Sequence, residues 1–241
     1  MRPLSENDSK RLLGLYQQGL YESAVNESRR LIRNHPNELI LHNILGLSLE
    51  GQGLLQLAAD AYQDALKINP AIPELQFNLG AMLYALNLWD KAIYHYQKAT
   101  ALNPNFTEAF FNLGITYQSQ GNFIKAIESY ERTLMIQPGF YEAIGNIGTI
   151  MQLQGNLDTA IEYFERALKI HQDARGHYNL AGALRNQGNL VLAIDHYKKA
   201  IEKGAHEPEF YSDLGDALWH DGQIKEANQF FRLAVEMSPS H

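Results

Sequence analysis

Small, apolar and aromatic residues recur along this chain with a period of 34 residues, which predicts a series of paired helices. The stretch 107–140 shows the pattern most fully, with Asn112, Gly114, Gly121, Ala126, Tyr130 and Pro138. Steps of 34 residues in either direction meet the same residue types. The chain is therefore predicted to be a tandem array in which each unit is a helix, a turn and a second helix.

The array has seven units when it is aligned on the glycine or asparagine that ends each first helix. Only the fifth unit is one residue short of 34. The units are 5–38, 39–72, 73–106, 107–140, 141–173, 174–207 and 208–241. Since each unit can contact only its neighbours, we expect residues 1–241 to form a single solenoid and not two domains.

Three positions of the unit carry the predicted packing. Position 20 is alanine in every unit. Position 8 is occupied by Leu12, Gly46, Gly80, Gly114, Gly148, Ala181 and Gly215. Position 24 is a large aromatic in six units: Tyr62, Tyr96, Tyr130, Phe164, Tyr197 and Phe231. We expect the small residue at position 8 to let the helix with alanine at position 20 approach closely, and the aromatic to fill the groove between units.

Helix ends are marked by two further positions. Position 15 holds Gly19, Gly53, Asn87, Gly121, Gly155, Gly188 and Gly222. Glycine and asparagine tolerate the left-handed conformation just past a helix end. The second helix is predicted to end at a proline, namely Pro36, Pro70, Pro104, Pro138 or Pro239.

This spacing of small, glycine, alanine, aromatic and proline positions over residues 5–241 resembles the tetratricopeptide repeat family. The resemblance implies an all-α fold, a right-handed α-α superhelix of seven helix-turn-helix repeats, with first helices on its concave face. Two departures stand out. In the first unit, Leu12 and Ser28 replace the small and the aromatic residue. At the junction of the fifth and sixth units, Gln172 and Ala205 replace proline, and we expect a changed stacking angle near 171–177.

The concave face implied by the resemblance carries a ladder of polar side chains at position 6: Asn78, Asn112, Asn146, Asn179 and Asp213. The superhelix of O-linked N-acetylglucosamine transferase has a similar asparagine ladder. A carboxamide both donates and accepts, so the ladder could bind the main chain of an extended peptide. The alternative is that these asparagines orient adjacent helices.

Aromatic residues surround the predicted ladder, namely Phe77, Phe111, Tyr178, Tyr84 and Trp219. Exposed aromatics in a groove are natural anchors for partner side chains, whereas buried ones would only pack the repeats together. Position 2 is acidic in several units, with Glu74, Glu108, Glu142 and Glu209. A ligand of this groove is therefore expected to be neutral to basic.

The second helix of the last unit carries Phe230, Leu233 and Met237 where middle units are largely polar. These residues form a predicted C-terminal apolar contact face. It would be covered by a second copy, by a partner, or by further residues of a longer protein; a tolerated exposed patch is the alternative.

Composition limits the chemistry. The formal charge of −7 argues against nucleic acid or an anionic membrane as the main partner, and no segment is predicted to insert into a membrane. No cysteine, phosphate loop, nucleophile motif or metal-binding motif occurs, so no catalytic residue, cofactor or metal is predicted. His171 and His177 are expected to be solvated, and His220 to lie nearest a ligand. A cytoplasmic location is expected from the missing secretion signal.

The predicted function is a non-enzymatic protein-protein interaction scaffold that binds an extended peptide or helix of a partner in its concave groove. One alternative is the substrate-recruiting arm of a larger glycosyltransferase or sulfotransferase. The other is a structural unit that assembles with itself through the C-terminal repeat.

Overall fold

The protein is described by a computed structural model over residues 4–204 and 206–237, which form α-helices and no strand. The helices are α1 (Glu6–Gln17), α2 (Tyr21–Asn34), α3 (Leu39–Gly51), α4 (Leu55–Ile68), α5 (Pro73–Ala85), α6 (Trp89–Leu102), α7 (Thr107–Ser119), α8 (Phe123–Ile136), α9 (Tyr141–Leu153), α10 (Leu157–Ile170), α11 (Ala174–Gln187), α12 (Leu190–Glu202), α13 (Pro208–His220) and α14 (Ile224–Met237). Odd-numbered helices begin at, or one residue after, the start of a predicted repeat. The expected all-α fold is confirmed.

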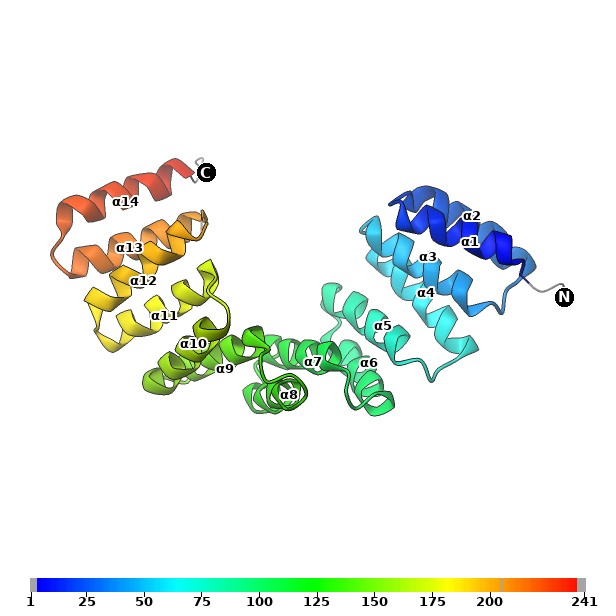
Figure 1. Cartoon of the computed structure of the whole chain (residues 1–241), viewed down its shortest axis with the longest axis horizontal. Helices are drawn as coiled ribbons and strands as arrows, with labels where there is room; N and C mark the ends of the chain where they lie inside the picture. The colour runs from blue at the N-terminus through cyan, green and yellow to red at the C-terminus, as the bar shows by residue number, and fades with distance from the viewer. Residues whose placement is uncertain (1–3, 205, 238–241) are drawn as a thin grey trace. The chain divides into compact units, whose positions relative to one another are not determined.

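The chain divides into two compact units, residues 1–132 and 133–241, with the division inside α8. Within the first unit, each helix from α1 to α7 packs against the next one along the chain. The same is true from α9 to α14 within the second unit, as the consecutive ribbons of Figure 1 show. Neighbours in sequence are thus neighbours in space, as expected for a repeat array.

The turn inside each repeat depends on a left-handed residue at position 15. All seven of these residues have positive φ, from 58° at Asn87 to 91° at Gly188. The predicted role of these glycines and the asparagine is confirmed. Pro36, Pro70, Pro104 and Pro138 each follow the end of a second helix by two residues, and Pro239 lies outside the described residues.

The small residue at position 8 has a different partner from the one we expected. A Cβ built on Gly46 would lie 2.5 Å from Cε1 of Tyr62, and one on Gly148 would lie 2.8 Å from Cε1 of Phe164. The same clash recurs at Gly80, Gly114 and Gly215. The glycine therefore makes room for the aromatic at position 24 of its own repeat. The alanine at position 20 is buried too, but it is not what demands the glycine.

In the first repeat, the large and the small side chain at positions 8 and 24 are exchanged. Leu12 occupies the small position and Ser28 the aromatic one, and both are completely buried. Leu12 belongs to a cluster with Ala24, Leu31 and Leu41. The large side chain has moved from the second helix to the first, which conserves the volume between them.

Candidate functional site

The predicted ladder lies on first helices. Asn78 and Asn112 belong to the first compact unit, and Asn146, Asn179 and Asp213 belong to the second. All five side chains are partly buried, and their bonding differs. Burial raises the pKa of the Tyr96 hydroxyl, and interaction with the Asn112 side chain of the following repeat partly offsets that rise; Asn146 also has an interaction partner. Within the described chain, no hydrogen bond is made by the side chains of Asn78 and Asn179. The ladder thus contains both engaged and available carboxamides.

Asp213 is the acceptor at the centre of a polar cluster on α11 and α13. The Tyr178 hydroxyl donates to its Oδ2 at 2.5 Å, and Arg185 Nη1 donates to its Oδ1 at 3.0 Å. Arg185 also lies 3.6 Å from Asp216. Burial, followed by the bond to Asp213, raises the pKa of Tyr178. These contacts join two consecutive repeats, so Asp213 stabilises the array as well as facing outwards.

Most of the predicted groove aromatics are packed inside the array. Phe77, Phe111 and Tyr178 contact the position 24 aromatics of their own repeats, with ring centroids 5.6 to 5.8 Å apart. The Tyr84 hydroxyl lies 3.2 Å from Ser119 Oγ in the next repeat. Trp219 differs, since it is 49% exposed. Packing therefore accounts for four of these aromatics, and Trp219 is the one best placed to meet a partner.

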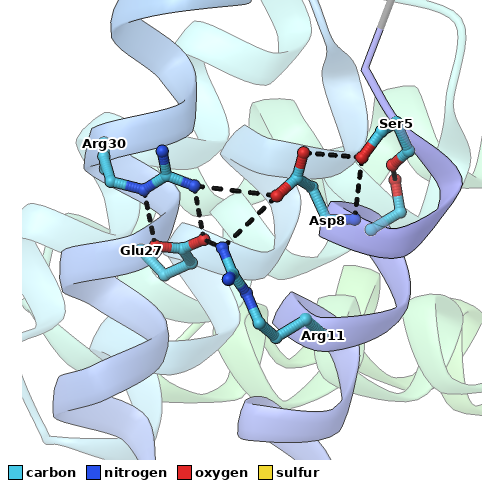
Figure 2. Close-up of polar contacts among 6 residues, drawn as sticks. Ser5, Asp8, Arg11, Glu27 and Arg30 are labelled. Atoms are coloured by element: carbon cyan, nitrogen blue, oxygen red, sulfur yellow. Dashed lines mark hydrogen bonds and ion pairs between the residues drawn. The ribbon is translucent and has the colours of Figure 1, made fainter.

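A second surface, which the repeat period did not reveal, is formed by positions 4, 23 and 26 of each repeat; we call it the 4–23–26 surface. In the first repeat these positions are Asp8, Glu27 and Arg30. Figure 2 shows Glu27 held by both Arg30 and Arg11. Hydrogen bonds from Arg30 and then Arg11 lower the pKa of Glu27 to about 2. This ionic network covers the side of the first helix pair.

The same three positions carry other chemistry in later repeats. His95 Nδ1 lies 2.7 Å from Gln76 Oε1 in the third repeat. His196 Nδ1 lies 3.0 Å from His177 Nδ1 in the sixth. Position 4 and position 23 are 19 residues apart, and residue type changes between repeats. A search for polar pairs at that spacing could have found this surface, whereas a search for conserved type at a 34-residue period could not.

The expectation that His177 is solvated is wrong, since only 5% of this residue is exposed. Burial, followed by His196 and nearby lysines, lowers the pKa of His177 to about 4. The pKa of His196 is also lowered, mainly by burial. His171 is exposed as expected, although its ring lies against Tyr141. His220 lies 4.0 Å from Asp216 on the exposed side of α13.

The predicted C-terminal face lies on α14. Leu233 is 41% exposed and Met237 is 37% exposed. Phe230 is partly buried, and its ring centroid lies 6.4 Å from that of Tyr211. Phe230 is therefore partly a packing residue, and the accessible portion of this face consists chiefly of Leu233 and Met237.

Tetratricopeptide-repeat models match residues 10–73, 80–121, 107–140 and 141–206, and a model of YpiA-like, C-terminal tetratricopeptide repeats matches residues 176–241. The chain belongs to the tetratricopeptide repeat family, whose fold is an interaction module. No curated protein matches its sequence.

Solved structures agree on the fold. A crystal structure of MamA is 29% identical, covers 71% of this chain and 97% of its own, and has a TM-score of 0.65. A tetratricopeptide repeat protein from Parabacteroides merdae is 20% identical, with coverage of 96% and 92% and a TM-score of 0.78. YrrB, described as a TPR protein with an unusual peptide-binding site, is 20% identical, with coverage of 76% and 95% and a TM-score of 0.59. Among the described residues, no helix has the length and apolar character needed to cross a membrane.

Proposed function

We propose that this protein is an interaction scaffold that binds an extended peptide of a partner protein along its first helices. The observation that carries the proposal is the partly exposed carboxamide of Asn179, which has no hydrogen-bond partner among the described residues. It lies on α11, whose Tyr178 and Arg185 hydrogen-bond Asp213 on α13, the helix that presents the half-exposed Trp219. A carboxamide could bond the peptide main chain, and an indole could hold one side chain. The peptide-binding site named for YrrB supports a role of this kind for the repeat fold.

The charge of this surface suggests the chemistry of the peptide. Glu142 and Glu209 are exposed at the start of α9 and α13, in the compact unit that holds Asn179 and Trp219, and Glu74 and Glu108 are exposed at the same repeat position in the other compact unit. Their field favours a neutral to basic peptide, and salt should weaken the attraction because exposed charges are screened.

A matched pair of variants tests the proposal. We would select peptides from a random display library on the full chain and measure their affinity by fluorescence anisotropy. Asn179→Ala should weaken binding about threefold to tenfold, the usual worth of one hydrogen bond, without changing the melting temperature. Trp219→Ala should weaken it further.

Asn112→Ala is the control, because the Asn112 side chain already interacts with the Tyr96 hydroxyl. It should lower the melting temperature more than Asn179→Ala does. Peptides that bind Asn179→Ala and Trp219→Ala as tightly as the wild type would refute the proposed surface.

A second candidate is self-association through α14, which the exposure of Leu233 and Met237 favours. Leu233→Asp is a cleaner probe than a change at Phe230, since Phe230 also packs against the helix pair. Light scattering over a range of concentrations should show a larger species for the wild type than for Leu233→Asp. A monomer in both cases would exclude self-association through this face.

A further inference from the structure

A basic cavity lies between α10, α11 and α12 of the second compact unit, in the sixth-repeat part of the 4–23–26 surface, and its lining includes no ladder residue. Its volume is about 550 Å³. Lys169, Lys199 and Lys203 line it together with the His177 and His196 pair, and Glu165 is the acidic residue in the lining. A concentration of cations is unexpected in a chain with a formal charge of −7.

The cavity coincides with the shortened junction between the fifth and sixth repeats. In two earlier repeats, the side chain at position 4 bonds the carbonyl of the proline that ends the preceding repeat. His42 Nε2 lies 2.8 Å from Pro36 O, and Gln76 Nε2 lies 3.0 Å from Pro70 O. Before the sixth repeat, Gln172 replaces this proline, and the junction is one residue shorter. His177 Nε2 is left buried, with no hydrogen-bond partner among the described residues.

This orphaned nitrogen determines where the protons of the histidine pair lie. A buried N–H without an acceptor is rarer in proteins than an unused acceptor, so Nε2 of His177 should carry no proton. The proton then sits on His177 Nδ1 and is donated to His196 Nδ1, 3.0 Å away. His196 must consequently hold its own proton on Nε2, on the opposite edge of the ring. The pair thereby offers an N–H donor from a cavity-lining residue while remaining neutral.

The lysines of the cavity are available to a ligand. Lys169 and Lys203 form no ion pair with another described residue. Lys199 pairs with Asp195 at 2.5 Å, but both side chains are about half exposed. An exposed pair of this kind contributes little and exchanges readily. Asp173, at the start of α11, accepts a hydrogen bond at its Oδ1 from the backbone N–H of Gly176 at 2.8 Å.

We propose that this cavity binds a phosphate group through Lys169, Lys199, Lys203 and the Nε2–H of His196. A phosphate presents several strong acceptor oxygens and up to two negative charges, which match three ammonium groups and one N–H donor. The phosphate could be carried by a phosphorylated side chain of a protein or by a small phosphate ester. The site is independent of the proposed peptide surface, since it involves other residues and a different part of the repeat.

The test is a titration of the full chain with inorganic phosphate at neutral pH, followed by ¹⁵N-detected imidazole signals. Phosphate should shift the His196 Nε2 signal saturably, in 150 mM sodium chloride to screen unspecific attraction. The double variant Lys199→Gln/Lys203→Gln should lose at least tenfold in affinity. Lys198→Gln is the matched control: its ammonium pairs with Glu226 at 2.7 Å and does not line the cavity, so binding should be retained.

Two further probes distinguish the sources of the phosphate. A phosphoserine peptide that binds more tightly than inorganic phosphate, while its unphosphorylated form does not bind, would indicate a protein ligand. Glycerol phosphate binding as tightly as that peptide would indicate a small ester. The proposal is overturned if phosphate leaves the His196 signal unchanged, or if Lys198→Gln weakens binding as much as the double variant does.

Discussion

Replacing Gly46 by alanine tests the contact between position 8 and position 24 directly. The new Cβ would lie 2.5, 2.7 and 2.9 Å from three ring atoms of Tyr62. The ring cannot retreat easily, because Tyr62 is completely buried and its hydroxyl donates to Glu50 Oε2 at 2.8 Å. Overpacking of this kind costs about 1 to 3 kcal/mol. Alanine regains about 0.5 to 1 kcal/mol of helix stability relative to glycine. We therefore expect a net loss of up to about 2.5 kcal/mol.

Gly145→Ala is the matched control, because a Cβ on Gly145 meets nothing within 4 Å. The same substitution in the same kind of helix should stabilise the protein by about 0.5 to 1 kcal/mol. Urea unfolding followed by circular dichroism should thus place the two variants on opposite sides of the wild type, separated by the overpacking cost of about 1 to 3 kcal/mol. A stabilising effect at both positions would refute the steric explanation of the repeat pattern.

Three other predictions concern buried groups. Leu12→Gly and Ser28→Tyr should each destabilise the first repeat, while the double variant recovers stability because it restores the arrangement of the other repeats; additive losses in thermal melts would contradict this. Tyr62→Phe should cost about 1 kcal/mol through loss of its hydrogen bond, whereas Tyr197→Phe should be nearly neutral, since that hydroxyl is buried with no hydrogen-bond partner among the described residues; equal urea midpoints would argue against the difference. The pKa of His177 is lowered to about 4 in the folded state. Neutral His177 therefore contributes its full share to the free energy of unfolding above the unfolded pKa near 6.5, and about 1 to 3 kcal/mol of that free energy is lost as the pH falls towards 4. His177→Gln should remove this part of the pH dependence, and a wild-type melting temperature that does not change between pH 7 and 4 would contradict the prediction.

The asparagine ladder shows why a repeated residue need not have a repeated role. Asn112 and Asn179 occupy the same position, yet Asn112 interacts with the Tyr96 hydroxyl, whereas the Asn179 side chain makes no hydrogen bond within the described chain. The tyrosine hydroxyls themselves find varied partners, such as Glu50 for Tyr62. A tyrosine hydroxyl at position 24 can meet either the residue at position 12 of its own repeat, such as Glu50, or the ladder residue of the next repeat. Because the residues at both positions vary, the repeat period alone could not separate structural asparagines from available ones.

The amino-acid sequence by itself determined the repeat length, the helix pairs, the left-handed turns and the residues of the predicted first-helix surface. These follow from local rules: a glycine at a helix end, a proline after it and an apolar period each act over a few residues. The tertiary structure decided which contacts those residues make. It placed Tyr62 against Gly46, buried both Leu12 and Ser28 completely, and buried His177 beside His196. These contacts join residues that are 16 or more positions apart in the sequence and lie on different helices. The space between the helices decides them, and one missing residue in a connection changes which side chains meet.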